Sequence, residues 1–229
     1  MAANDSNTVY VVTGGNRGLG LGIVKSLLAR PNTTVIATVR NEDGASSLTR
    51  ETTAAPKAAF KSDIDHIDVL INNAGGTSPL IPATETTAED LRAAFEANTI
   101  APLLVFQALL PLLQKSLSPK LVMVTSSVGS IAEMEPMPGG AYGPSKAAQN
   151  WLTKALHLEN KDHGLITIAL HPGWVKTRAG QFAADQWGFA SGPPDTIESS
   201  VEGMLKIIDE ASSETSGTFI TQTGQILGW

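Results

Sequence analysis

The chain of 229 residues contains no cysteine. Disulfide bonds, a thiol nucleophile and a zinc site built on thiolates are therefore excluded. The four histidines show no metal-ligand spacing, so we expect no metal. Basic residues are also few, with 16 Lys and Arg against 22 Asp and Glu, a formal net charge of −6 and no basic cluster. Because nucleic-acid surfaces group Lys and Arg, we expect a small-molecule substrate and no nucleic-acid partner.

Long apolar runs are missing as well. The longest, APLLVFQALLPLLQ, is interrupted by Pro102, Gln107 and Pro111, whereas a membrane span needs about 20 apolar residues. The first residues, MAANDSNTVYVV, show no basic start followed by an apolar core and a cleavage site. We therefore expect no membrane association and a cytoplasmic location. With 42% hydrophobic and 17% charged residues, the composition fits one globular domain over residues 1–229.

Short runs rich in Val, Ile and Leu recur along the chain between segments of helical periodicity. The runs are TVYVVTG, TTVIATV, IDVLINNAG, KLVMVTSS, LITIALHPG and GTFITQTG. The helical segments are GLGIVKSLLAR, AEDLRAAFEANTIAPLLVFQALLPLLQK, SKAAQNWLTKALHLENK and TIESSVEGMLKIIDEA. Continuous apolar strands that alternate with helices are typical of a parallel sheet covered on both faces. The sequence therefore predicts one doubly wound α/β domain in three layers.

The segment between the second and third of these strands is short for such a fold. It comprises residues 41–66, NEDGASSLTRETTAAPKAAFKSDIDH. A doubly wound sheet of this type normally has a helix, an edge strand and a second helix here. If KAAFKSDI were that strand, too few residues would remain before Asp68, because a parallel crossover needs ~12 or more. We therefore expect one crossover helix, a missing third (edge) strand, and an order 2-1-4-5-6-7 that leaves the second strand at an edge.

A glycine-rich turn, TGGNRGLG, joins the first strand to the first helix. Gly14 suits a tight turn, Gly18 a close approach of backbone to phosphate, and Gly20 close packing of helix on strand. The N-terminus of the helix offers unpaired N–H groups and a partial positive charge to a pyrophosphate. Because the pattern follows a strand and opens a helix, it indicates a dinucleotide site rather than an empty turn.

The end of the second strand distinguishes the two nicotinamide cofactors. NAD-binding versions of this fold have an acidic residue there for the ribose 2′-hydroxyl. This chain has Thr38, Val39 and Arg40 instead. Arg40 and Arg17 can both donate to a 2′-phosphate, although both can also be solvated surface side chains. We therefore predict NADPH/NADP+ as the cofactor.

Three further motifs end at the carboxyl edge of the predicted sheet, where such folds bind ligands. NNAG, residues 72–75, brings backbone close to a cofactor, and TSS, residues 125–127, supplies hydroxyls. Tyr142 and Lys146 share one helix face if AYGPSKAAQ is helical, and Pro144 suits its first turn. The pair can be packing, or it can be an acid and the charge that lowers the pKa of its phenol, which is ordinarily near ~10.

The chain resembles the short-chain dehydrogenase/reductase family over nearly its whole length. TGGNRGLG, NNAG, Asn98, TSS, YGPSK and HPGWVKT occur in the family's order. The resemblance implies a Rossmann-type fold. It also implies a catalytic group in which the tyrosine protonates a carbonyl oxygen, the serine hydrogen-bonds that oxygen, the lysine holds the ribose and lowers the tyrosine pKa, and the asparagine continues a proton relay. By motif these are Tyr142, Ser126, Lys146 and Asn98.

Several of these residues also allow a structural role. Ser127 is more readily a turn or cap residue than Ser126, which lies three residues before Gly129, as the family's serine does. Asn98 can instead bend its helix or satisfy backbone groups. His171 fits packing or hydrogen bonding better than catalysis. The residues expected to bind the cofactor are Gly14, Asn16, Arg17, Gly18, Leu19, Arg40, Asn73, Ala74, Gly75, Tyr142, Lys146, Pro172, Gly173, Val175 and Thr177.

More narrowly, the chain is similar to sniffer-type carbonyl reductases and to norsolorinic acid ketoreductases. NRGLGLG, HPGWVKT and the closing GQILGW carry the first likeness, and AYGPSKAAQNWLTKALHLENK with SVEGMLKIIDEASSETSGTFI the second. The likeness implies reduction of a ketone, with an aromatic or polyketide carbonyl as one option. It also implies a homodimer or homotetramer that pairs through the long helices containing Asn98 and Trp151.

The family places a mobile substrate lid near residues 178–196. Aromatic side chains there and in the loop before Tyr142 can cover an apolar ketone, or they can be ordinary packing. They are Trp174, Phe182, Trp187 and Phe189, with Met134 and Met137 opposite. A different interpretation of the whole chain is an NADP-binding regulatory or scaffold protein with a vestigial site. The shortened third-strand region favours that interpretation, and the intact serine, tyrosine and lysine favour the enzyme.

Overall fold

The computed structural model describes residues 7–41, 48 and 64–229. Within them, parallel strands form one sheet in the order β2-β1-β3-β4-β5-β6. The strands are β1 Thr8–Thr13, β2 Thr33–Thr38, β3 Val69–Asn72, β4 Lys120–Val124, β5 Ile166–His171 and β6 Thr218–Thr221. Each coincides with one of the apolar runs in the sequence. The predicted α/β class and strand order are therefore confirmed.

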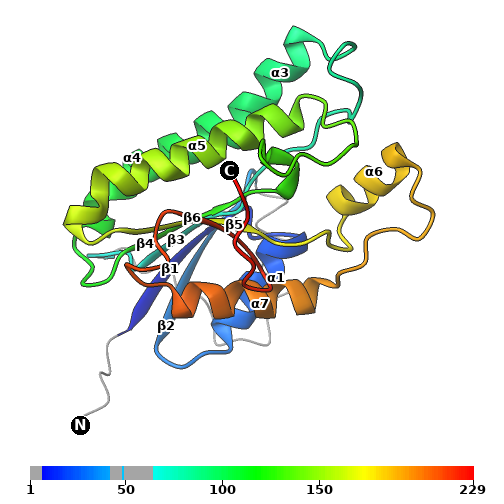
Figure 1. The fold of residues 1–229 in the computed structure, drawn as a ribbon. Helices are drawn as coiled ribbons and strands as arrows, with labels where there is room; N and C mark the ends of the chain where they lie inside the picture. Colours follow the sequence, from blue (N-terminus) through cyan, green and yellow to red (C-terminus); the bar gives the residue numbers. More distant parts are fainter. Residues whose placement is uncertain (1–6, 42–47, 49–63) are drawn as a thin grey trace.

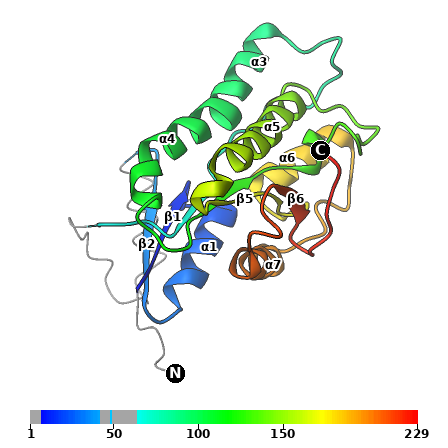
Figure 2. The same cartoon turned by 60° about the vertical axis from the view of Figure 1, so that its left-hand side comes forward.

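Helices cover both faces of this sheet (Figure 1). On one face lie α1 Gly18–Leu28 and α7 Ile197–Glu210. On the other lie α4 Ala101–Leu113 and α5 Tyr142–Asn160, with α3 Ala88–Phe95 leading into α4 (Figure 2). Short helical turns are η1 Glu96–Ile100, η2 Ser127–Gly129 and η3 Lys161–His163. The arrangement has the three layers that the sequence predicts.

The strands bury side chains on both faces, which explains their unbroken hydrophobicity. In β1, Tyr10 and Val12 pack toward α1 and α7, whereas Val9 and Val11 pack toward α4 and α5. A strand alternates its side chains in this way because its period is two residues. The two cores fix the sheet between its helices, and with it the carboxyl ends of the strands.

β2 lies at the edge of the sheet within the described part of the chain. This is the position that the shortened segment predicts for it. The expected crossover helix falls in residues 42–63, which apart from Leu48 lie outside the described residues. Leu48 itself packs against the core that contains α1 and α7.

A single helical stretch runs from Ala88 to Leu113, and its middle turn, η1, is a π-helix. Such wide turns inside α-helices frequently lie at functional sites. By length and apolar composition alone the stretch resembles a membrane span, but that is weak evidence because core helices of soluble proteins pass the same test. One side of it packs on the sheet through Phe106 and Leu113, and its apolar outer side is largely uncovered in the single chain.

The predicted lid contains a helix that the sequence analysis did not identify. α6 spans Arg178–Trp187 and projects beyond the sheet (Figure 1). Thr177 caps it by accepting a hydrogen bond from the Gly180 N–H, and Gly188 ends it in a left-handed conformation with φ of 72°. Both are standard helix boundaries, so TRAG and the later WG were the signals available in the sequence.

Candidate active site

The motif residues gather at one edge of the sheet. Because the strands are parallel, the loops after β1, β3, β4 and β5 all leave from the same side, and the N-termini of α1 and α5 face it. These loops carry TGGNRGLG, NNAG, TSS and HPGWVKT. The topology therefore brings together segments that are up to about 160 residues apart in the sequence, as expected at the carboxyl edge of a doubly wound sheet.

The glycine-rich turn has the geometry that its sequence predicts. Gly14 and Gly18 have φ of 70° and 53°, which only glycine adopts without strain. A Cβ at Gly20 would collide with the Gly14 carbonyl, so the helix could not pack this closely with any other residue. Arg17 precedes α1 without a side-chain cap, and the first turn of the helix carries no acidic residue. These features fit a phosphate-bearing ligand at the helix N-terminus.

The loop after β3 is tied to this turn through Thr13, which the sequence analysis did not single out. Its hydroxyl oxygen accepts hydrogen bonds from the N–H groups of Asn73 and Ala74 at 3.0 and 2.9 Å. The Asn73 side-chain amide donates in return to the Thr13 carbonyl at 2.9 Å. The side chain of Asn73 thus bonds to backbone, and these hydrogen bonds join the loop after β1 to the loop after β3.

Ser126 and Tyr142 meet at the end of β4. Ser126 caps η2, where its hydroxyl oxygen accepts a hydrogen bond from the Val128 N–H at 3.3 Å. Burial raises the pKa of Tyr142 to about 12, and a hydrogen bond with the Ser126 side chain partly offsets this effect. The expected lowering of the tyrosine pKa by Lys146 is therefore not what the structure shows. At neutral pH the phenol is protonated and able to donate.

Lys146 lies one turn further along α5, with its ammonium nitrogen 5.7 Å from the centroid of the Tyr142 ring. The side chain is 5% exposed, and its ammonium donates hydrogen bonds to the Val124 carbonyl and the Gln149 side-chain carbonyl, each at 2.9 Å. Burial lowers the pKa of Lys146 to about 7 because the charged form loses its hydration. The structure thus joins the tyrosine, the serine and the lysine of the prediction.

Asn98 lies in the π-helical turn and is fully buried. Its side chain pairs with both backbone groups of Gly76, at 2.9 and 3.0 Å, and donates to the Ser145 hydroxyl at 3.0 Å. Ser145 in turn donates to the Tyr142 carbonyl at 2.7 Å. The side chain of Asn98 therefore fixes the loop after β3 to the start of α5, and its role in a proton relay stays a prediction.

His171 holds the serine loop from the end of β5. Its Nδ1 accepts a hydrogen bond from the Ser127 N–H at 3.1 Å. Burial lowers the pKa of the imidazole to about 4, so His171 is neutral at neutral pH and Nδ1 is free to accept. The structure thus gives His171 a hydrogen-bonding role, and it gives Ser127 a backbone contact.

The segment after β5 leads into α6. Gly173 has a φ of 85°, and a Cβ there would clash with the side chains of Asp195 and Gln222. Asp195, which the sequence analysis missed, accepts a hydrogen bond from the Trp174 N–H at 2.9 Å, and its backbone bridges to Val175. A Cβ at Gly18 would lie 3.6 Å from Thr177, so HPGWVKT faces the glycine-rich turn. The two predicted phosphate-binding segments are adjacent.

Three of the predicted lid aromatics pack together. The ring of Trp174 lies edge-on to those of Trp187 and Phe189, with centroid distances of 5.9 and 5.2 Å. The indole N–H of Trp187 donates to the carbonyl of Pro138 at 2.9 Å. This contact joins α6 to the loop that precedes Tyr142 and contains Met137, while Met134 of the same loop is 71% exposed.

The C-terminal residues brace that loop from the other side. The Trp229 carbonyl accepts hydrogen bonds from the N–H groups of Ile131 and Ala132 at 3.2 and 2.9 Å. The Ser130 hydroxyl donates to the Gly228 carbonyl at 2.7 Å. The loop between Ser126 and Tyr142 is therefore held both by the lid and by the chain end.

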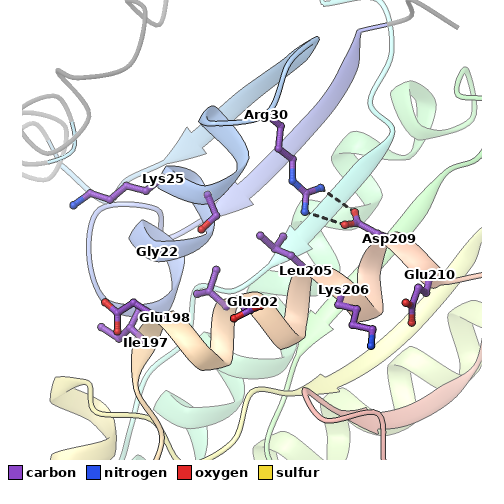
Figure 3. Close-up of a pocket in the computed structure, with 12 residues that line it drawn as sticks. Gly22, Lys25, Arg30, Ile197, Glu198, Glu202, Leu205, Lys206, Asp209 and Glu210 are labelled. Atoms are coloured by element: carbon purple, nitrogen blue, oxygen red, sulfur yellow. Dashed lines mark hydrogen bonds and ion pairs between the residues drawn. The ribbon is translucent and has the colours of Figure 1, made fainter. Parts of the chain in front are cut away.

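Two cavities differ in their relation to these residues. One of about 810 Å³ lies between the glycine-rich turn and α6, and Gly18, Thr177 and Phe182 line it. The other, of about 560 Å³, lies between α1 and α7 beside the Arg30–Asp209 ion pair (Figure 3). The second is lined by none of the predicted site residues. The first is lined by Gly18 and Thr177 of the predicted cofactor site, but not by Ser126, Tyr142 or Lys146. Arg17 and Arg40 are both exposed, at the start of α1 and just beyond β2.

The edge as a whole fits a nicotinamide dinucleotide. It has a helix N-terminus without a side-chain cap behind glycines, a buried lysine beside a protonated tyrosine, and an exposed Arg40 instead of a carboxylate just beyond β2. Among the described residues, no group of three or more His, Asp or Glu side chains is arranged to hold a metal ion.

Comparisons with known proteins agree with this geometry. The family model described as short chain dehydrogenase matches residues 50–187. The chain is 36% identical to the short-chain dehydrogenase srdF of Neurospora crassa over 245 aligned positions, which cover 96% of each protein. It is 33% identical to the norsolorinic acid ketoreductase nor1 of Dothistroma septosporum, covering 99% of this chain and 94% of the relative.

Solved structures give the same picture. The NADPH-bound carbonyl reductase from chicken fatty liver is 31% identical, with a TM-score of 0.83, and the match covers 98% of this chain and 95% of that one. The carbonyl reductase Sniffer of Drosophila melanogaster is 26% identical, with a TM-score of 0.82 and coverage of 98% and 100%.

Proposed function

The chain belongs to the short-chain dehydrogenase/reductase family, and on that premise we propose that it reduces a ketone to an alcohol with NADPH. The observation that carries the proposal is the cluster of Ser126, Tyr142 and Lys146 at the carboxyl edge of the sheet. The likeness to an NADPH-bound carbonyl reductase supports the choice of cofactor, as do Arg17 at the start of α1 and Arg40 just beyond β2.

In this mechanism NADPH, when bound, supplies the hydride that reaches the carbonyl carbon. Tyr142 donates its proton to the carbonyl oxygen, and Ser126 donates a hydrogen bond that orients that oxygen. Because the pKa of Tyr142 is about 12, the phenol holds its proton until charge develops on the substrate oxygen. Lys146 would hold the ribose of the bound cofactor, and Asn98 fixes the loop after β3 to α5 through its hydrogen bonds to Gly76 and Ser145.

The substrate that we propose is a bulky apolar ketone, with an aromatic or polyketide carbonyl as the first candidate. The edge-on cluster of Trp174, Trp187 and Phe189 supports an aromatic-lined cover. The likeness to norsolorinic acid ketoreductases of fungi supports the same class. We further propose that the protein works as a homo-oligomer, because apolar side chains on α4 and α5 are left exposed.

Replacing Tyr142 with Phe tests the function most directly. The variant keeps the ring but lacks the proton donor, so we expect turnover of an aromatic ketone to fall by about 100-fold or more. NADPH binding, followed by the fluorescence of the reduced nicotinamide, should stay within a few-fold of the wild-type value. Retained turnover in Tyr142→Phe would refute the assignment.

The wild-type measurements also separate the enzyme from an NADP-binding regulatory protein. Binding of NADPH without turnover of any member of a panel of aromatic and aliphatic ketones would favour the regulatory interpretation. Failure to bind NADPH would reject both functions.

A further inference from the structure

Gln149 makes a buried contact with Lys146 that no motif indicates. It lies on α5 three residues after the lysine and is 1% exposed. Its side-chain carbonyl accepts a hydrogen bond from the Lys146 ammonium at 2.9 Å. Its side-chain nitrogen is buried and has no hydrogen-bond partner among the described residues. A glutamine that is buried with half of its polar groups unpaired requires an explanation.

The orientation of this amide follows from chemistry. An ammonium group has three donors and no acceptor, so only the carbonyl oxygen of Gln149 can face Lys146. Rotating the amide would place two donors against each other and leave the ammonium with one partner in a buried site. The lysine therefore determines which half of the amide is paired.

The ammonium of Lys146 divides its donors among partners of two kinds. One goes to the Val124 carbonyl at 2.9 Å, which belongs to the backbone of β4 and cannot move. Another goes to the side-chain carbonyl of Gln149, and no hydrogen bond of the ammonium to a third acceptor is found among the described residues. Of the two acceptors of the ammonium, only that of Gln149 belongs to a side chain, so it is the one that a substitution can change.

Resting on the proposed function, we propose that Gln149 is a positioning residue that favours the charged form of the Lys146 ammonium and aims it at the ribose of NADPH. Burial alone favours the neutral amine, since the pKa of Lys146 is about 7. A carbonyl oxygen at hydrogen-bonding distance opposes that effect because it stabilises the charged form only.

Few other ionisable groups can account for the titration of this lysine. Tyr142 faces it from the same helix and stays protonated well above neutral pH. Desolvation by burial is the resolved cause of the lowered pKa of Lys146. Among the elements packed against α5, α3 and η1 carry Glu89, Asp90, Arg92 and Glu96, whose side chains are at least partly exposed, and β5 carries His171, whose pKa is about 4. Between pH 5 and 10, the charge of Lys146 therefore changes without a titrating neighbour among these groups.

The test measures the titration of Lys146 directly in the cofactor-free protein. Lysine labelled with ¹³C at Cε reports protonation by NMR, and the Lys146 signal is the one that Lys146→Met lacks. In Gln149→Met the charged form loses its acceptor, so we expect the midpoint to fall by about one pH unit. In Gln149→Glu a carboxylate replaces the carbonyl, so the midpoint should rise. Gln114→Met, at the exposed end of α4, should leave it unchanged.

NADPH binding gives a second measurement. Because a neutral amine holds the ribose less well, the dissociation constant should increase above the Lys146 midpoint, and in Gln149→Met this increase should begin at a pH lower by the same amount. If one of the two Gln149 variants fails to fold, the shift of the Lys146 midpoint in the other variant still tests the proposal. Equal midpoints in wild type and both variants overturn the inference even if NADPH binds. Shifted midpoints without NADPH binding at any pH overturn the proposed function and the part of the inference that concerns ribose.

Discussion

At the scale of single residues, burial has opposite effects on the pKa values of the two ionisable groups of the site. It raises the pKa of Tyr142 to about 12 and lowers that of Lys146 to about 7. In both cases the neutral form gains, because low-polarity surroundings disfavour charge. The tyrosine is thereby kept as a proton donor, whereas the lysine is balanced between its two states. A contact that stabilises the ammonium therefore changes the charge of Lys146 at neutral pH, whereas a contact to the phenol leaves Tyr142 protonated.

Arg40 carries the prediction of cofactor choice. It is exposed just beyond β2, where a carboxylate would hold the ribose of NADH. Arg40→Glu replaces a charge-assisted donor with a repelling charge, so the preference for NADPH over NADH should fall by about 10- to 100-fold. Fluorescence titration of both nucleotides measures this ratio.

A matched variant separates this local effect from a change of net charge. Arg92 is exposed on α3, and Arg92→Glu changes the net charge by the same amount without facing β2. We expect its nucleotide preference to equal that of wild type. An unchanged preference in Arg40→Glu would show that the 2′-phosphate is held elsewhere.

At the scale of helices and strands, the apolar runs predicted the sheet because parallel strands are buried on both faces. α6 was not predicted, because RAGQFAADQW looks like a polar loop and its one fully buried residue is Ala184. The π-helical turn around Asn98 could not be predicted from the sequence either. It depends on how one long helix fits both α5 and the loop after β3, which local periodicity does not encode.

The lid helix gives a prediction at this scale. Trp187 joins α6 to the loop before Tyr142 by its hydrogen bond to Pro138 and packs on Trp174. Trp187→Phe keeps an aromatic ring but removes the donor, so the lid should open more easily and the KM for an aromatic ketone should rise about 5-fold. Trp187→Ala also loses the ring contact, and its KM should rise further. Steady-state kinetics at saturating NADPH measure both.

Trp151, exposed on α5, supplies the control for these variants. Trp151→Phe should leave KM unchanged, because this side chain lies outside the lid. NADPH affinity should be preserved in Trp187→Phe and Trp187→Ala. If the KM of Trp187→Ala equals that of wild type, α6 does not cover the substrate.

At the scale of the whole molecule, motif order predicted which segments meet, whereas contacts between side chains came only from the folded chain. TGGNRGLG and HPGWVKT are predictable neighbours because parallel strands end at one edge. The hydrogen bonds of Thr13, Asp195 and Gln149 could not be predicted in this way. Each depends on how side chains and loops pack in the folded chain. The alignment with srdF spans 245 positions, more than the chain has residues, so it contains gaps in this chain. That agrees with the shortened segment before β3.

The outer surface of α4 and α5 gives the last prediction. Leu104, Trp151 and Leu158 are 55%, 70% and 54% exposed there, and we call this surface the α4–α5 face. Large apolar side chains on two neighbouring helices fit an isologous interface, in which each helix pair packs on its copy. We therefore expect sedimentation velocity at micromolar concentration to show at least a dimer. Trp151→Glu buries a charge in that interface, so its dissociation constant should rise by about 100-fold or more.

Leu117 provides the matched control, because it is fully exposed in the turn that follows α4 and is not one of the residues of the α4–α5 face. Leu117→Glu introduces the same charge and should sediment as wild type. If Trp151→Glu dissociates while its NADPH affinity is unchanged, the interface and the cofactor site are independent. If wild type is a monomer, or if Trp151→Glu sediments with wild type, the α4–α5 face does not pair two copies of the chain.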